Sequence, residues 1–293
     1  MKILVITKKT LIIAAAAIIA LIIAAAAVAV AAAGSERAPK SANAEPKPTA
    51  LAFSGDNDPA GGKLLSSADA YEVQVLAGFK RELPVYSVSR DDMRIALTID
   101  AAWDDDKTPF ILETLEKYNV KATFFLCGFW AEAYPEMVKA VSDAGHSIGN
   151  HSMTHPHMTK ISEQKMIEEI SKLDDMLERI TGKRSVLFRA PYGEYNDKVI
   201  LTVRSSGHEP IQWDVDTIDW KPERSSQAIL DSVLSKLRSG SIILCHNNGY
   251  KIEEYLPVLI ETAQANGYVF VTVDELLLEG DTVIDVNGVQ KSA

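Results

Sequence analysis

The sequence predicts an α/β fold: a distorted (β/α) barrel of about seven parallel strands, preceded by a single N-terminal transmembrane helix. From Arg94 onward, short apolar runs alternate with helical patterns. This alternation is typical of a parallel sheet with helices on its outside, and the number of successive units favours a barrel over an open sheet. A long apolar run near the start of the chain indicates the transmembrane helix.

The apolar run extends without interruption from Leu11 to Ala33, and Lys2, Lys8 and Lys9 precede it. A helix rises about 1.5 Å per residue, so this run is long enough to cross the core of a bilayer. Positive charge before the run places the N-terminus in the cytoplasm. We therefore expect a single-pass protein of the cell membrane whose main domain is extracytoplasmic. A signal peptide cleaved at the Ala-rich end of the run is the alternative, and it also exports the chain.

The composition divides the chain into three parts. Residues 1–33 form the cytoplasmic tip and membrane anchor, or the signal peptide. Residues 34–70 are rich in Ala, Pro, Ser and Gly and have no apolar period, which is typical of a flexible linker. Residues 71–293 form one domain with its core at 94–278. The end of the chain after Asp281 is expected to be a weakly structured tail or an added short hairpin.

Local signals mark the ends of several elements. The longest helix starts near Ser162, carries apolar residues at helical spacing and ends at Gly182. Thr108 followed by Pro109 indicates an N-cap and a first helical residue. The segment 82–88 is expected to be extended. The expected strands are Ile95–Ile99, Lys121–Leu126, His146–Gly149, Val186–Arg189, Glu209–Trp213, Ser241–Cys245 and Tyr268–Val273.

Charge and cysteine content exclude some classes of protein. The formal net charge is −10 at pH 7 and the chain has no basic run outside its first residues. We expect no nucleic-acid partner, since such binding relies on cations that neutralise phosphates. Cys127 and Cys245 do not belong to a C-x-x-C pair, which excludes a zinc ribbon or a thiol redox motif. They are either small buried side chains or, outside the cytoplasm, a disulfide.

Polar residues gather where the expected strands end, which is where barrel enzymes place their chemistry. Asp100 follows the first strand and shares a face with Ala96 and Thr98, because alternate residues of a strand point the same way. His151 and His155 are four residues apart, a spacing that can bring two imidazoles to one metal ion. Caps, turns and packing are the alternative explanations for these residues.

Three later stretches point in the same direction. Arg189 ends a strand and can orient a carboxylate through a bidentate contact. Residues 213–220 hold three acids and two tryptophans, a combination that suits a sugar-binding loop. His246 ends an apolar strand and shares a face with Leu244, so it is a candidate proton carrier. A surface arginine, a loop with core tryptophans and a buried histidine are the respective alternatives.

Together, these stretches resemble one family in the order of its motifs. The chain from Arg94 to about Leu278, roughly two thirds of its length, is similar to the polysaccharide deacetylases of carbohydrate esterase family 4, also called the NodB homology domain. The matching motifs are T-x-D at Thr98–Asp100, H-S-x-x-H at His151–His155, R-x-P-Y-G at Arg189–Gly193, D-x-x-D-W at Asp216–Trp220 and L-x-H at Leu244–His246.

The first motif departs from the family pattern. The family reads T-F-D-D-G, and its second Asp is a metal ligand; Ala101 and Ala102 replace that Asp and the Gly in this sequence. The variant is similar to that of sporulation-type deacetylases of spore-forming bacteria. The third ligand then has to come from elsewhere, and Asp104–Asp106 lie close enough in sequence to supply it. The alternative is that these acids cap the helix that begins near Thr108.

The resemblance implies a divalent metal cofactor, zinc with cobalt as the alternative, held by His151 and His155. It implies that Asp100 is the general base, which removes a proton from the attacking water. Arg189 would orient Asp100. His246 would donate a proton to the leaving amine.

The remaining implied roles concern alignment and substrate binding. Asp219 would keep His246 charged and aligned. The backbone N–H near Tyr192 would help to hold the oxyanion. Leu244 and Trp220 would shape a small apolar pocket for the acetyl methyl group.

The function that the resemblance implies is metal-dependent removal of N-acetyl groups from an extracytoplasmic amino-sugar polymer. The expected partner is an N-acetylated cell-envelope polysaccharide, either peptidoglycan or a chitin-like glycan, and the membrane is contacted through the N-terminal helix. The alternatives are a non-catalytic glycan-binding protein that lost its metal with Ala101, an amidohydrolase acting on a small cyclic amide, and an esterase acting on acetylxylan.

Overall fold

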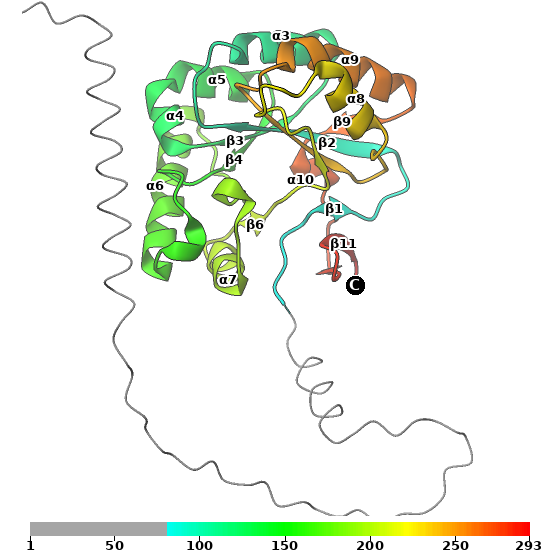
Figure 1. Ribbon diagram of the computed structural model, residues 1–293. Helices are drawn as coiled ribbons and strands as arrows, with labels where there is room; N and C mark the ends of the chain where they lie inside the picture. Colours follow the sequence, from blue (N-terminus) through cyan, green and yellow to red (C-terminus); the bar gives the residue numbers. More distant parts are fainter. Residues whose placement is uncertain (1–80) are drawn as a thin grey trace, which may run out of the picture. The chain divides into compact units, whose positions relative to one another are not determined.

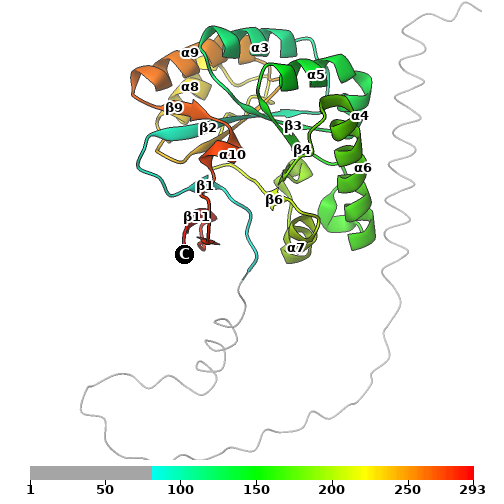
Figure 2. The same cartoon turned by 180° about the vertical axis from the view of Figure 1, so that it is seen from behind.

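The structure, a computed structural model, describes residues 81–293. Its main feature is an eight-stranded sheet in which the strand order is β6-β5-β4-β3-β2-β8-β7 and β9 also pairs with β2 (Figures 1 and 2). Every pairing in this sheet is parallel. Its strands are β2 (Arg94–Ala101), β3 (Thr123–Leu126), β4 (Ser147–Asn150), β5 (Leu187–Phe188), β6 (Glu209–Pro210), β7 (Val215–Asp216), β8 (Ile242–His246) and β9 (Val269–Val271).

The sheet is an open half-barrel. β6 and β7 lie at its two ends, and no strand pairing within residues 81–293 joins them. Each of the seven expected apolar runs contains a strand of this sheet, which confirms the prediction of about seven parallel strands. The strand that was not expected is β7, which is two residues long and falls in the acidic stretch 213–220, where no apolar run marks it.

Helices connect the successive strands of this sheet, except β6 and β7, between which only residues 211–214 lie. In both views α3, α5, α8 and α9 lie together on one side of β2 and β3 (Figures 1 and 2). The helices are α3 (Thr108–Lys117), α4 (Gly128–Ala133), α5 (Pro135–Asp143), α6 (Glu163–Thr181), α7 (Asp197–Ser205), α8 (Ser226–Leu234), α9 (Ile252–Ala265) and α10 (Val273–Leu276).

Two helix predictions have different outcomes. α6 begins after Ser162, whose side chain accepts a backbone hydrogen bond, and ends at Gly182 with a left-handed φ of 74°, as expected. The N-cap of α3, however, is Lys107, and Thr108 is already helical, so the expected cap is wrong by one residue. The physical reason is that the Thr108 side chain is buried and accepts a hydrogen bond from Asn247.

The central strand β2 separates the apolar core from the interior of the half-barrel. Ile95, Leu97 and Ile99 belong to the core cluster that the helices cover. Burying each of these side chains contributes about 1.5–3 kcal/mol to folding. Thr98 and Asp100 alternate with them and therefore point the opposite way. This alternation places the Asp100 carboxylate inside the half-barrel, at the carboxyl end of its central strand.

A second, three-stranded sheet joins the two ends of the described chain. β1 (Ser87–Val88) pairs in parallel with β11 (Val289–Ser292), and β11 pairs antiparallel with β10 (Thr282–Ile284). The end of the chain is thus a short hairpin, one of the two expected alternatives.

Cys127 and Cys245 are both free and buried. Cys127 precedes α4, and Cys245 lies in β8 with its Sγ atom 3.3 Å from the Thr98 carbonyl oxygen. Of the two expectations, small buried side chains is the one confirmed.

The predicted transmembrane helix at Leu11–Ala33 and the linker at 34–70 lie outside the described residues. Within residues 81–293, no helix combines the length and the apolar character needed to cross a membrane.

Candidate active site

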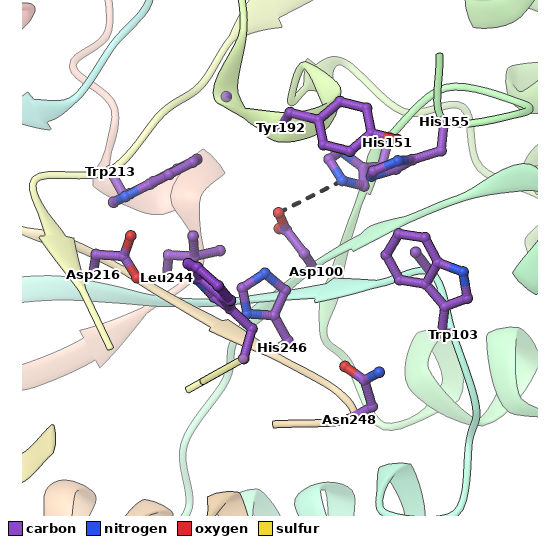
Figure 3. A pocket seen from close by; sticks show the side chains of 13 residues that line it. Asp100, Trp103, His151, His155, Tyr192, Trp213, Asp216, Leu244, His246 and Asn248 are labelled. Carbon is purple, nitrogen blue, oxygen red and sulfur yellow. Dashed lines mark ion pairs between the residues drawn. The ribbon is translucent and has the colours of Figure 1, made fainter. Parts of the chain in front are cut away.

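A pocket of about 520 Å³ opens where the central strands end (Figure 3). Its lining includes seven residues predicted from the sequence, namely Asp100, His151, His155, Tyr192, Trp220, Leu244 and His246. Two further predicted residues, Arg189 and Asp219, are fully buried and contact lining residues from behind. The structure therefore brings all the predicted site residues together, although they come from five separate stretches of the chain.

Arg189 holds the Asp100 carboxylate in place. Its Nη1 atom donates to Asp100 Oδ1 at 2.6 Å and to Thr98 Oγ1 at 2.8 Å. Its Nη2 atom donates to the carbonyl oxygen of Gln212 at 3.1 Å. The contact with Asp100 is thus not the bidentate one expected, since Nη2 donates to Gln212 and Nε has no hydrogen-bond partner among the described residues. As a result, Asp100 Oδ2 faces His151 Nε2, at 3.7 Å.

The surroundings of Asp100 set its charge. Burial alone would raise the pKa of this carboxyl group, but the charge of Arg189, with contributions from His151 and His246, outweighs burial. The net effect lowers the pKa of Asp100. Asp100 is therefore an ionised carboxylate, the form that can accept a proton.

Aromatic rings fix the position of the Arg189 guanidinium. Its central carbon lies 4.0 Å from the Phe125 ring centroid and 5.4 Å from that of Trp213. Gly149 gives the Phe125 ring its room, since a Cβ atom there would lie 2.3 Å from Phe125 Cδ1. Phe125 could not be singled out from the sequence, because an apolar residue inside a strand looks like ordinary core.

His246 and Asp219 form the second polar pair of the site. His246 Nδ1 lies 2.7 Å from Asp219 Oδ1. Asp219 Oδ2 accepts hydrogen bonds from the His246 backbone N–H at 3.1 Å and from the Tyr255 hydroxyl at 2.7 Å. Gly249 allows this close approach, because a Cβ atom there would lie 2.2 Å from Asp219 Oδ2. Burial lowers the pKa of His246, but the hydrogen bond to Asp219 and its charge outweigh burial, so that the pKa is raised.

His151 and His155 lie next to each other, with ring centroids 4.9 Å apart. His151 Nδ1 lies 2.8 Å from the carbonyl oxygen of Arg189, so this nitrogen carries the proton and Nε2 keeps its lone pair. His155 Nδ1 is buried and has no hydrogen-bond partner among the described residues. Burial lowers the pKa of both rings, that of His155 to about 4. Both are thus neutral imidazoles near pH 7, the form that binds metal ions.

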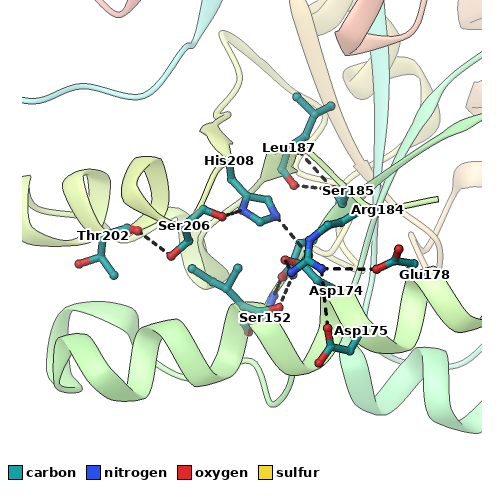
Figure 4. Close-up of polar contacts among 12 residues, drawn as sticks. Ser152, Asp174, Asp175, Glu178, Arg184, Ser185, Leu187, Thr202, Ser206 and His208 are labelled. Carbon is teal, nitrogen blue, oxygen red and sulfur yellow. Dashed lines mark hydrogen bonds and ion pairs between the residues drawn. The ribbon is translucent and has the colours of Figure 1, made fainter.

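Two buried acids on α6 anchor the loop that carries these histidines. Glu169 accepts hydrogen bonds from the Thr154 backbone N–H at 2.7 Å and from the Thr154 hydroxyl at 3.0 Å. Asp174 accepts a hydrogen bond from Asn150 Nδ2 at 2.9 Å. Asp174 Oδ1 also lies 3.1 Å from His208 Nε2 (Figure 4). Neither acid was predicted as part of the site, since a charged residue in an amphipathic helix usually faces solvent.

The first motif contributes no additional carboxylate to the pocket. Ala101 is fully buried in the apolar core cluster, on the opposite face of β2 from Asp100, whereas Ala102 lines the pocket. Asp104, Asp105 and Asp106 are absent from the lining. The Asp104 carbonyl oxygen instead accepts hydrogen bonds from Trp130 Nε1 and Asn247 Nδ2, each at 2.6 Å.

The donor atoms fit a divalent metal ion in part. His151 and His155 present two neutral imidazoles, and the unpartnered Nδ1 atom of His155 shows that hydrogen bonds within the protein do not satisfy this ring. Within residues 81–293, however, no group of three or more His, Cys, Asp or Glu residues is arranged to hold a metal ion. The pair therefore resembles an incomplete zinc site, since zinc sites in enzymes normally have three protein ligands.

The rest of the pocket is mainly apolar and aromatic, with Asp216 and Asn248 as its further polar side chains. Tyr192 has a left-handed φ of 61°, and its ring stacks on that of His157 with centroids 4.4 Å apart. Gly193 has a φ of 66°, and a Cβ atom there would lie 2.9 Å from the Trp213 ring. Leu244 lies on the same strand face as His246 and is almost fully buried, whereas Trp220 is 54% exposed.

Comparisons with known proteins agree with this geometry. A sequence model described as polysaccharide deacetylase matches residues 87–211. A peptidoglycan-N-acetylglucosamine deacetylase of Bacillus cereus is 37% identical over 186 residues, which are 62% of this chain and 67% of that protein. The peptidoglycan-N-acetylmuramic acid deacetylase PdaA of Bacillus subtilis is 30% identical over 197 residues, which are 66% of this chain and 75% of that protein.

Solved structures give the same result. A pseudoenzyme of carbohydrate esterase family 4 from Bacillus anthracis aligns with a TM-score of 0.63 and 34% identity, over 66% of this chain and 68% of that one. The match extends over the parallel half-barrel described above, so this fold is the class to which the chain and these structures belong. The chain belongs to the polysaccharide deacetylases of carbohydrate esterase family 4.

Proposed function

We propose that this protein hydrolyses the N-acetyl group of an amino sugar in peptidoglycan, outside the cytoplasm and with a divalent metal ion bound. One observation carries the proposal: an ionised, buried Asp100 and a histidine of raised pKa, His246, line the same pocket as two neutral histidines. The relatives support the substrate, since their names state activity on peptidoglycan amino sugars. The predicted segment Leu11–Ala33 supports the location.

The protein's own groups divide the proton transfers between them. Asp100 removes a proton from the attacking water through Oδ2, while Arg189 keeps Oδ1 engaged. The C–N bond of the amide then breaks, and His246 donates a proton to the departing amine, with Asp219 holding the ring in position. A divalent ion such as zinc or cobalt, bound by His151 and His155, would polarise the acetyl carbonyl and lower the pKa of the water.

The charge of the pocket favours an uncharged sugar. Among the described residues, none of those lining the pocket is Lys or Arg, and two of them, Asp100 and Asp216, are acids. A free carboxylate on the sugar would meet these acids without a Lys or Arg in the described lining, so that only the charge of His246 and of the bound metal ion would offset them. N-acetylglucosamine therefore fits the pocket better than an N-acetylmuramic acid residue with a free lactyl carboxylate.

The test uses the purified full-length protein in detergent, peptidoglycan fragments, and added zinc or cobalt. We expect acetate release that depends on metal and stops in Asp100→Asn, and mass spectrometry that locates the free amine on glucosamine. Absence of acetate from the metal-loaded protein with every fragment would rule the proposal out.

A second candidate function is binding of the same glycan without catalysis. It is favoured by Ala101 at the usual position of a metal ligand and by the family pseudoenzyme among similar structures. This function predicts that the protein binds the glycan but releases no acetate at saturating zinc. The same assay therefore separates the two candidates.

A further inference from the structure

Trp103 and Phe129 form an exposed aromatic surface beside the pocket. Their ring centroids lie 6.1 Å apart and the rings are inclined by 53°. Trp103 is 52% exposed and Phe129 is 36% exposed. Trp103 also lines the pocket, where its ring meets that of His155 edge-on, with centroids 5.0 Å apart. The Trp103–Phe129 surface thus begins at the pocket and extends away from it.

The backbone beneath both rings is firmly held. The Asp104 carbonyl, next to Trp103, accepts the two short hydrogen bonds from Trp130 and Asn247. The Phe129 backbone N–H donates to the Met153 carbonyl oxygen at 3.1 Å. Exposed aromatic side chains on a fixed backbone lose little conformational freedom when a ligand binds, which favours affinity.

The Trp103–Phe129 surface begins on the side of the pocket opposite to Trp213 and Leu244. Figure 3 shows Trp103 and Asn248 on one side of Asp100, with Trp213 and Leu244 on the other. A sugar whose acetyl methyl group points toward Leu244 therefore has Trp103 on its opposite side. A neighbouring sugar in a polymer would extend over Trp103 and Phe129.

We propose that the Trp103–Phe129 surface binds the sugar adjacent to the one that is deacetylated, in a chain of uncharged N-acetylated amino sugars. This inference rests on the proposed function. The apolar C–H face of a pyranose ring packs against an aromatic ring, and Asn248 at the pocket wall supplies a polar side chain for hydroxyl or amide groups. Because the described lining has no Lys or Arg, the pocket favours a neutral polymer over a phosphate-rich one.

The experiment measures kcat and KM of the full-length protein for N-acetylglucosamine and for its oligomers from the disaccharide to the pentasaccharide. It compares Trp103→Ala, Trp103→Phe and Phe129→Ala with Leu201→Ala, a control that removes an equally exposed apolar side chain of α7 outside the lining. Binding of the pentasaccharide to each variant in an Asp100→Asn background is measured by calorimetry, so that the result does not depend on turnover.

We expect Trp103→Ala to raise KM and the dissociation constant for the oligomers about tenfold and to affect the monosaccharide, which has no adjacent sugar, clearly less, with Trp103→Phe in between. A loss of activity that is equal for the monosaccharide and the oligomers would overturn the inference, since Trp103 would then act only by supporting His155. Unchanged pentasaccharide binding would overturn it as well. Trp103-dependent binding without acetate release would contradict the proposed function and uphold the surface.

Discussion

The two sides of the pocket differ in whether charged partners hold their polar side chains. On the acid–base side, Asp100 has Arg189 and His246 has Asp219, at 2.6 and 2.7 Å. On the histidine side, His151 Nδ1 has a backbone carbonyl, His151 Nε2 lies 3.7 Å from Asp100 Oδ2, and His155 Nδ1 has no partner among the described residues. The proton-transfer groups are thus positioned by charge pairs within the site.

The histidine side is positioned from a distance. Glu169 and Asp174 on α6 hold the histidine loop by hydrogen bonds. These bonds go to the residues that flank the histidines and not to the imidazole rings themselves. We therefore expect substitutions on the acid–base side to lower turnover directly. Substitutions on the histidine side should change metal affinity first and chemistry only through it.

The largest expected effect is that of Asp100→Asn. The amide cannot accept the proton, and removing a proton-transfer group typically lowers turnover by about 10²–10⁴-fold. Acetate release at saturating metal measures this loss, and calorimetric titration with zinc should show nearly unchanged affinity. If the variant lost zinc affinity as severely as His151→Ala does, Asp100 would belong to the histidine side and the comparison would fail.

Asp219→Asn should move the pH profile. Asp219 raises the pKa of His246, so it keeps the proton-donating form present at higher pH. Without the Asp219 charge that pKa falls, and the alkaline limb of kcat/KM should move to lower pH by as much as the pKa does. At a fixed alkaline pH, activity then drops about tenfold for each pH unit that the limb moves.

Tyr255→Phe is the matched control, because it removes a hydrogen bond to Asp219 and leaves the charge in place. An alkaline limb that stays where it is in Asp219→Asn would remove His246 from the role of proton donor.

Glu169→Gln should weaken metal binding without moving the pH profile. The substitution weakens the hydrogen bonds that hold Thr154, one residue before His155. Loss of a group that orients a metal ligand typically costs about 10–100-fold in affinity or activity. Glu168→Gln is the matched control, since Glu168 is the adjacent acid and its side chain is 42% exposed. Equal zinc affinities for the two variants would show that α6 does not position the histidine loop.

On both sides, sequence reasoning anticipated the residues at strand ends and missed the helical residues behind them, for physical reasons. Strand runs and strand-end residues such as Asp100 and His246 could be predicted because alternation and parallel topology bring strand ends together. Tyr255 and Glu169 could not, because each reaches the site from the buried face of a helix, and sequence spacing does not show which distant group a helical side chain meets. Sequence spacing also did not show where the side chains of Asp104–Asp106 lie. Hydrogen bonds to the Asp104 carbonyl fix this stretch, and none of the three acids lines the pocket.

The smallest expected effect tests whether the histidine side can be completed. Ala101 is the position of the missing family carboxylate, yet its side chain lies in the apolar core cluster. Ala101→Asp buries a charge without a partner, which should lower the melting temperature of the metal-free protein by about 5 °C. If the carboxylate can turn from the core toward His151 and His155, it becomes a third ligand, and saturating zinc should restore part of the loss. Ala101→Asn is the matched control, because it has the same shape without the charge and should gain less from zinc.

Thermal unfolding of both variants with and without zinc measures this difference. Equal zinc-induced shifts would mean that the carboxylate does not reach the metal, and that the strand end of this protein holds its side chain in the core.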